Sequence, residues 1–279
     1  MNANLEPGLY IVATPIGNLS DLSPRAAATL AGADVIAVED SRVTGKLLNH
    51  IGVKRPMTPY HDHNADAVRP RLIERMASEA VALVSDAGTP LISDPGFKLV
   101  RDARAAGRNI VTIPGPSAVV AGLTLAGLPT DRFLFMGFLP AKQGQKEATI
   151  SEVGAVRATL VFYESGPRLG ATLSTLARLL GPREAAVARE LTKTFEECVT
   201  GSLPDLAARY ADAPPKGEIV LMVGPPGEPE PASDAEGEAA LIEALTRLPP
   251  AKAAGEVARA LGLDRKALYA RAMALKTEG

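Results

Sequence analysis

The stretch VALVSDAGTPLISDPG, residues 81–96, decides the fold. It opens with four apolar residues in a row and turns polar at Ser85 and Asp86. The ten residues after Asp86 include two glycines, two prolines and a second aspartate, Asp94. An unbroken apolar run predicts a strand covered on both faces, and glycine and proline permit the sharp turns of a loop. The stretch therefore predicts a buried strand whose carboxyl end carries two aspartates.

The same pattern recurs on both sides of this strand. Short apolar runs predict further strands at 9–13, 34–38 and 109–113. Amphipathic segments between them predict helices at 23–30, 43–50, 70–79 and 95–106. Strands that alternate with helices form an open, mainly parallel α/β sheet. Residues 1–116 are therefore predicted to form an N-terminal α/β domain.

A second α/β domain is predicted over residues 117–225, after a hinge near 113–116. Its expected strands are 133–138, 159–163, 185–188 and 219–223. Its expected helices are 117–126, 168–180 and 203–211.

The end of the chain changes in composition. Residues 225–238, PPGEPEPASDAEGE, hold five acidic residues, four prolines and no basic residue, which is typical of a solvated linker, predicted here as 226–240. Residues 250–279 instead hold six Lys or Arg against three acids. The apolar spacing around Gly262 predicts two short helices in a helix-turn-helix-like appendage, 241–279.

Composition excludes several classes of protein. The 279 residues carry a net charge of −2, so any contact with nucleic acid must use local basic patches. One cysteine and three histidines argue against a disulfide and a usual metal site. We read no signal peptide and no membrane helix, so the expected location is the cytoplasm. The dinucleotide, Walker A and G-x-S-x-G fingerprints are missing as well.

Five polar loops lie along the predicted N-terminal domain, most of them directly after a predicted strand. They read ATPIGN (13–18), VEDSR (38–42), YHDHN (60–64), SDAGTPLISDPG (85–96) and IPGPSA (113–118). Each loop alone can be read as a turn, a helix cap or a pair of surface histidines. Together they meet at the carboxyl edge of an open parallel sheet, where ligands bind.

These loops, with AGLPTDRFLFMGFLP (126–140) and LVFYESGPRL (160–169), resemble the ribosomal RNA small subunit methyltransferase I family of the tetrapyrrole (corrin/porphyrin) methylase superfamily. The resemblance covers about residues 8–224. It implies two α/β domains of the tetrapyrrole methylase type with S-adenosyl-L-methionine in the interdomain cleft, and a homodimer. The implied reaction is 2′-O-methylation of a cytidine in small-subunit ribosomal RNA.

The resemblance also implies which residues contact the cofactor. Ala87 stands where the superfamily has proline, and Glu164 where it has methionine. The implied contacts are Pro15, Ile16, Gly17, Ser85, Asp86, Ala87, Thr89, Ser117, Ala118, Tyr163, Glu164, Leu191, Gly217, Glu218 and Ile219.

Methyl transfer to a ribose hydroxyl also requires that the hydroxyl lose its proton, to a side chain or to water. The candidates for a general base are Glu39, Asp40, His61 and Asp94, all on predicted strand-end loops. The candidates for RNA phosphate contacts are Arg42, Lys98, Arg101 and Lys193. The basic appendage either contacts RNA or only stabilises the protein.

Three other functions stay open at this point. One is methylation of a tetrapyrrole or of a diphthamide precursor; YHDHN, VEDSR and Glu164 favour the ribosomal RNA branch instead. Another is a non-catalytic RNA-binding assembly factor, against which the intact loop at Asp86 argues. A sugar-phosphate enzyme on an unrelated α/β fold ranks last, because only generic strand-end glycines support it.

Overall fold

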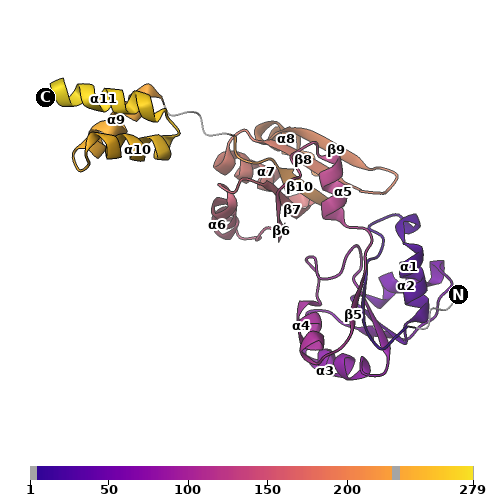
Figure 1. Ribbon diagram of the computed structural model, residues 1–279. Coiled ribbons are helices and arrows are strands. Elements are labelled where there is room, and N and C mark those ends of the chain that lie inside the picture. The colour runs from indigo at the N-terminus through magenta and orange to yellow at the C-terminus, as the bar shows by residue number, and fades with distance from the viewer. Residues whose placement is uncertain (1–4, 228–232, 279) are drawn as a thin grey trace. The chain divides into compact units, whose positions relative to one another are not determined.

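The computed structural model describes residues 5–227 and 233–278. The chain divides into two compact units, one up to Pro225 and one from Pro226 onward (Figure 1). The first unit holds two five-stranded sheets. Within the described residues, no helix has both the length and the apolar character needed to cross a membrane.

The first sheet is entirely parallel, as the sequence predicts. Its strands are β1 (Gly8–Val12), β2 (Val35–Val38), β3 (Met57–Pro59), β4 (Ala80–Val84) and β5 (Ile110–Ile113), in the order β3-β2-β4-β1-β5. The helices between them are α1 (Pro24–Gly32), α2 (Ser41–His50), α3 (Ala65–Arg75) and α4 (Phe97–Ala105), and a 3-10 turn, η1 (Leu19–Asp21), precedes α1.

Successive residues of these strands enter two different cores. Tyr10 and Ala82 pack with α1 and α2 on one face, whereas Leu9 and Val81 pack with α3 and α4 on the other. Because both faces are covered, every position of β4 is buried. This explains the unbroken apolar run with which residues 81–96 begin.

Helix α3 begins earlier than the sequence predicts. Pro70 was expected near its start but lies inside the helix, which begins at Ala65. The backbone N–H of His61 donates to Asn64 Oδ1 (2.9 Å), and this closed turn leads directly into the first helical residues. The turn that the side chain of Asn64 closes therefore determines where the helix starts, and Pro70 does not. The short strand β3, only three residues long, was not predicted either.

The second sheet is mixed. Its strands are β6 (Phe133–Phe138), β7 (Thr159–Ser165), β8 (Glu184–Arg189), β9 (Glu197–Ser202) and β10 (Glu218–Val223), in the order β6-β7-β10-β8-β9. Only β6 and β7 run parallel, and the other three pairs are antiparallel. Strand β9 and helix α6 (Gln143–Val153) are additions to the predicted elements.

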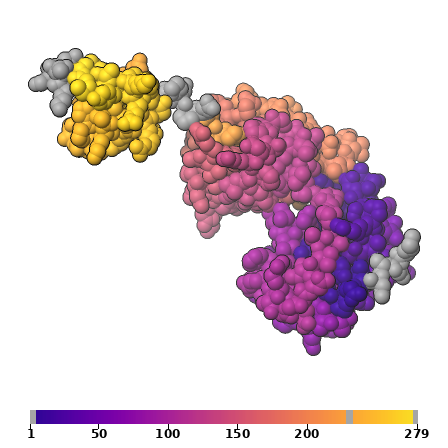
Figure 2. Space-filling model, in the orientation of Figure 1, coloured from indigo at the N-terminus to yellow at the C-terminus, as the bar shows by residue number. Residues whose placement is uncertain are grey.

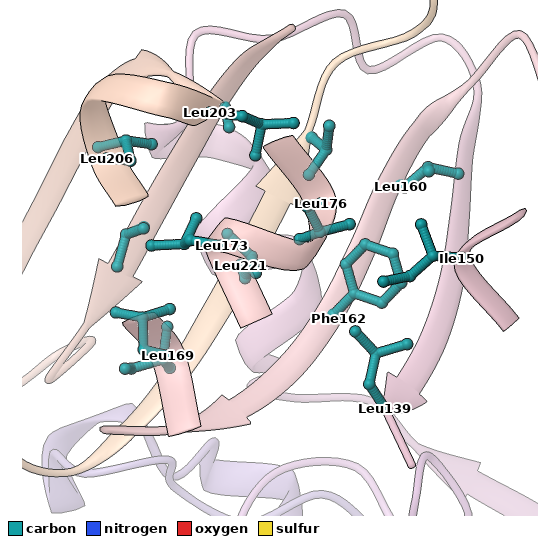
Figure 3. Close-up of a cluster of buried hydrophobic side chains, with 14 of the residues drawn as sticks. Leu139, Ile150, Leu160, Phe162, Leu169, Leu173, Leu176, Leu203, Leu206 and Leu221 are labelled. Carbon is teal, nitrogen blue, oxygen red and sulfur yellow. The ribbon is translucent and has the colours of Figure 1, made fainter. Parts of the chain in front are cut away.

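Helices cover both faces of this sheet. Helices α6, α7 (Gly166–Leu180) and α8 (Leu203–Arg209) cover one face, where Leu173, Phe162 and Leu221 are fully buried (Figure 3). Helix α5 (Ala118–Leu125) covers the other face through Val119 and Leu123. Tyr163 and Ile16 are partly buried against this second face, which is the face that carries the cavity described below.

The second unit is a three-helix body made of α9 (Asp234–Leu245), α10 (Pro250–Leu261) and α11 (Arg265–Glu278) (Figure 1). Figure 2 draws the atoms of this unit in orange and yellow. Leu241, Val257 and Leu268 are among its buried core residues. The predicted linker 226–240 is therefore too long, and the appendage has one helix more than predicted. The physical reason is a capping box: Ser233 and Glu236 exchange hydrogen bonds and start α9 inside the acidic stretch.

Candidate active site

A cavity of about 370 Å³ lies in the first unit, at the carboxyl ends of the parallel strands. The loops after β1, β2, β4 and β5 contribute residues from one side, and β6, β7, β10 and the loop after β8 contribute residues from the other. The volume lies within the range of about 300–1,000 Å³ that is usual for small-molecule sites. The lining residues are Ile16, Glu39, Asp86, Ala87, Gly88, Thr89, Ile92, Ser93, Asp94, Ser117, Ala118, Phe138, Tyr163, Glu190, Leu191, Lys193, Glu218, Ile219 and Val220.

The loop after β4 is bonded to the loops that follow β1 and β5. Thr14 and Gly88 exchange two backbone hydrogen bonds, of 2.8 and 3.0 Å, in an isolated antiparallel bridge. Gly88 has φ +79°, a conformation that glycine adopts without strain. Thr89 Oγ1 donates to the carbonyl of Pro116 (3.0 Å), which precedes α5. Three strand ends therefore form one connected rim.

Asp86 and Glu39 belong to the same network. The backbone N–H of Asp40 donates to Asp86 Oδ1 (3.0 Å), and the backbone N–H of Asp86 donates to Glu39 Oε2 (3.4 Å). These bonds join the end of β2 to the end of β4. Burial raises the pKa of both carboxyl groups, and the backbone bonds partly offset that rise.

Asp94 differs most from an ordinary aspartate. Burial, together with the nearby charges of Glu39 and Asp86, raises its pKa to about 6, although a hydrogen bond with Ser85 opposes the rise. Burial likewise raises the pKa of Tyr163 to about 12, so its phenol is neutral at physiological pH. Asp94 therefore exchanges its proton close to neutral pH.

The cavity favours a cationic ligand. Five carboxylates line it, those of Glu39, Asp86, Asp94, Glu190 and Glu218. The ammonium group of Lys193 also lines it but is 3.1 Å from Glu190 Oε1. A positively charged ligand would stabilise the ionised carboxylates and relieve their desolvation. Across the part of the chain that the structure describes, no group of three His, Cys, Asp or Glu side chains is placed to hold a metal ion.

The backbone around the cavity is locally strained. Among residues 5–227 and 233–278, four residues other than glycine have positive φ, and each lies in a loop that lines the cavity: Leu91, Ser93, Glu190 and Thr192. Such conformations cost of order 1–3 kcal/mol each and cluster at functional sites. This strain supports the assignment of the cavity as the functional site.

Most of the predicted cofactor residues line the cavity, namely Ile16, Asp86, Ala87, Thr89, Ser117, Ala118, Tyr163, Leu191, Glu218 and Ile219. Pro15, Gly17, Ser85 and Gly217 do not line it but neighbour residues that do. A Cβ atom on Gly17 would lie 2.6 Å from the Lys193 side chain, and one on Gly217 would collide with the Glu190 carboxylate. These two glycines therefore allow the close approach of the loop after β8.

The structure places the side chain of Glu164 away from the cavity. Its neighbour Tyr163 faces the cavity, and successive residues of a strand point to opposite faces. The Glu164 side chain is fully buried on the side of α7, where it accepts from Thr172 Oγ1 (2.7 Å) and pairs with Arg168 (3.3 Å). Its carboxylate is therefore not among the groups that line the cavity.

The four candidate bases do not all lie at the cavity. Glu39 and Asp94 line the cavity, whereas Asp40 and His61 do not. Asp40 accepts from the backbone N–H of Arg42 (2.8 Å) as the N-cap of α2, and bonds with the Arg42 guanidinium lower the pKa of Asp40 to about 2. His61 lies close enough for its charge to affect the pKa of Glu39.

The four cations predicted to contact RNA are not brought together. Lys193 lines the cavity, but Arg42 is paired with Asp40 (2.5 Å) in an exposed ion pair. On α4, Lys98 pairs with Asp66 (3.5 Å) and Arg101 with Asp102 (2.9 Å).

Sequence reasoning did not single out Gly88, Ile92, Ser93, Phe138, Glu190 and Val220, which also line the cavity. The first three lie in the stretch 81–96, so proximity to Asp86 and Asp94 could have identified them. For Phe138 and Glu190 the sequence offers no signal, because a β-bulge and a strained loop bring them to the site.

Comparisons with known proteins agree with this architecture. Residues 8–207 match the family described as Tetrapyrrole (Corrin/Porphyrin) Methylases, and residues 231–276 match the RsmI C-terminal HTH domain. The solved structure of diphthine synthase is similar in fold, with a TM-score of 0.63 at 18% identity over 78% of this chain and 89% of that one. Uroporphyrin-III C-methyl transferase from Thermus thermophilus, complexed with S-adenosyl homocysteine, gives a TM-score of 0.55 at 21% identity over 78% and 97%.

Similarity in sequence is much higher to two bacterial proteins. Ribosomal RNA small subunit methyltransferase I of Erythrobacter litoralis is 55% identical over 273 residues, which cover 98% of this chain and 97% of that protein. The protein of the same name from Mesorhizobium japonicum is 50% identical over 275 residues, covering 98% and 93%.

Proposed function

The chain belongs to the tetrapyrrole methylase family and, within it, to the ribosomal RNA small subunit methyltransferase I proteins, and from this premise we propose that it methylates the 2′-hydroxyl of a cytidine in small-subunit ribosomal RNA. The observation that carries the proposal is the acidic cavity at the strand ends, where Glu39, Asp86 and Asp94 meet. Identity over nearly the whole chain supports RNA as the substrate class.

The methyl donor of this family is S-adenosyl-L-methionine, and the cavity fits it in charge and size. When bound, the donor supplies a methyl group that a sulfonium already activates. Asp86 and Glu218 offer carboxylates to its positive groups, and Leu191 and Ile219 offer apolar surface to its ring. Gly88 permits close approach of the backbone.

Asp94 is our proposed general base. A base works best when its pKa lies near the working pH, and the value of about 6 for Asp94 meets that requirement better than the value of about 2 for Asp40. Asp94 would take the proton of the ribose hydroxyl while the hydroxyl oxygen would form its bond to the methyl carbon, the bond from that carbon to the donor's sulfur would break, and the sulfur would leave as a neutral thioether. Glu39, the other candidate that lines the cavity, would keep Asp94 basic through its negative charge.

The proposal also includes the cellular setting. The substrate is small-subunit RNA, in the assembled subunit, and the protein works in the cytoplasm. Lys193 is the proposed phosphate contact at the site, because it lines the cavity. The homodimer that the family resemblance implies stays a prediction.

Methylation of isolated small ribosomal subunits tests the proposed function. The substrate is taken from cells that lack the gene for this enzyme, and the donor carries a labelled methyl group. Mass spectrometry of RNA fragments is expected to find label on one 2′-O-methylcytidine. Label on a base, on a tetrapyrrole or on a diphthamide precursor supplied in parallel would contradict the proposal. Absence of donor binding in calorimetry would instead support a non-catalytic assembly factor.

The second unit supplies a further expected result. Lys252, Arg259 and Arg265 line one groove of this unit. We propose that the groove contacts RNA phosphates. Reversal of all three charges to glutamate is expected to raise the KM for ribosomal subunits about tenfold. It should also reduce the slope of log affinity against log salt by about 2 to 3, because each phosphate contact contributes about 0.7–0.9 to that slope.

The donor affinity of this triple variant should stay unchanged, because the three residues lie outside the unit that carries the cavity. Lys54→Glu, which reverses an exposed charge on the first unit, provides a control for altered net charge. Equal KM values and salt slopes in the triple variant and the unaltered protein would assign the second unit a structural role alone.

A further inference from the structure

A β-bulge determines the direction of Phe138. Phe135 pairs with Val161 and Phe138 with Tyr163, so two residues of β6 stand opposite one residue of β7 between these pairs. Without the extra residue, Phe138 would pair with Glu164 and point to the side of α7. The bulge moves it to the face of Tyr163, which is the face that carries the cavity.

Gly137 makes this bulge possible. It has φ +64°, a conformation that L side chains rarely adopt. A Cβ atom on Gly137 would lie 2.9 Å from Ser93 Oγ, so the bulge also approaches the strained loop after β4. The extra residue therefore brings β6 close to the loop that carries Asp94.

The ring of Phe138 is supported but open to solvent. Its centroid lies 5.5 Å from that of Tyr163, which in turn packs edge-on against Phe135 at 4.9 Å. Nevertheless 52% of Phe138 is exposed. Ile92 lines the same cavity from the loop after β4 and is 41% exposed. Apolar surface left open at a cavity that five carboxylates also line indicates that a ligand covers it.

We propose that the ring of Phe138 stacks against the base of the nucleotide that is methylated. This assignment rests on the proposed function, because it needs an RNA substrate. A ribose hydroxyl reaches an enclosed cavity only if its nucleotide leaves the stack of neighbouring bases. An aromatic side chain replaces the stacking that is lost. The carboxylates of the lining would repel phosphates from the interior, so the base with its ribose would enter, and the flanking phosphates would stay outside, within reach of the 43% exposed side chain of Lys193.

Replacement of Phe138 tests this assignment. Loss of a base–aromatic stack is expected to lower kcat/KM for isolated ribosomal subunits by about 5- to 150-fold in Phe138→Ala. Phe138→Trp and Phe138→Tyr should keep most of the activity because they retain a π-face. Phe138→Leu keeps apolar bulk without that face and should resemble Phe138→Ala. The donor affinity, measured by calorimetry, should change less than about twofold if the ring stacks on RNA alone.

Phe133→Ala is the matched control. Phe133 begins the same strand and is 47% exposed, but it does not line the cavity, so this variant should keep full activity. Full activity of Phe138→Ala or Phe138→Leu would overturn the assignment, and so would a loss of donor affinity that matches the loss of activity. If the unaltered protein transferred no methyl group to ribosomal subunits, the proposed function would fail and this assignment with it.

Discussion

Asp94→Asn is expected to lower kcat by about 10²- to 10⁴-fold, the usual contribution of a general base. Asparagine keeps the size and the hydrogen-bonding shape of the side chain but cannot accept a proton. In the structure Asp94 lies on the loop after β4, lines the cavity and has a pKa raised to about 6. Single-turnover methylation of ribosomal subunits measures the loss.

The pH dependence of methylation also tests whether Asp94 is the base. The base works as a carboxylate, so kcat/KM should rise with pH and level off above about 6, where Asp94 of the free enzyme is ionised. A bound cation lowers the pKa of carboxylates near it, so the corresponding rise in kcat should come at lower pH. Asp94→Asn should lose this part of the profile altogether.

Glu39→Gln is the companion variant, and the donor affinity of both variants should be measured. Loss of the Glu39 charge should lower the pKa of Asp94, because that charge is one of the causes that raise it. The pH profile should therefore shift to lower pH and keep its shape. If Asp94→Asn turned over at the full rate with normal donor affinity, Glu39 or water, and not Asp94, would accept the proton.

Glu164→Ala is expected to lower the free energy of unfolding by about 3–5 kcal/mol, because loss of one partner leaves a buried charge unpaired. Lys146 is 4% exposed, and its Nζ donates to Thr172 Oγ1 (3.0 Å), which in turn donates to Glu164 Oε2 (2.7 Å). Burial lowers the pKa of Lys146, and the charge of Glu164 opposes that shift. Denaturant unfolding, followed by circular dichroism, measures the change.

Two further variants separate charge from packing. Glu164→Gln keeps acceptors for Thr172 and for the backbone N–H of Ser165 (2.9 Å), so it should cost less than Glu164→Ala. The double variant Glu164→Leu with Lys146→Met removes the two buried charges and fills the space, and the remaining charge, that of Arg168, is on a side chain that is 34% exposed. It should recover most of the stability, because apolar pairs of similar volume replace buried ion pairs without loss. A double variant as unstable as Glu164→Ala would assign the effect to packing.

The parallel sheet and its rim were predictable from sequence. Strands buried on both faces are unbroken apolar runs, and glycine, proline or a polar residue ends each of them. Parallel strands place their carboxyl ends at one edge, so Asp86 and Ser117 could be placed in one site without any knowledge of contacts. The family resemblance added Tyr163 from the second sheet and Leu191 from the loop after β8.

What could not be predicted depends on strand register and backbone strain. Tyr163 and Glu164 are adjacent in a strand, so only one of their side chains can face the cavity, and the sequence does not say which. The run FLFMGF of β6 conceals its extra residue, and with it the direction of Phe138. Glu190 reaches the site through a positive φ, which nothing in its residue type indicates.

The bridge between Thr14 and Gly88 has a consequence for the thermodynamics of ligand binding. Because these loops are already braced to each other, to the end of β2 and to the segment before α5, the conformational entropy of ordering them is lost when the chain folds. A ligand then meets a preorganised receptor, and its binding free energy is not diminished by that ordering. The conformational entropy of the pocket loops is therefore lost during folding and not when the ligand binds.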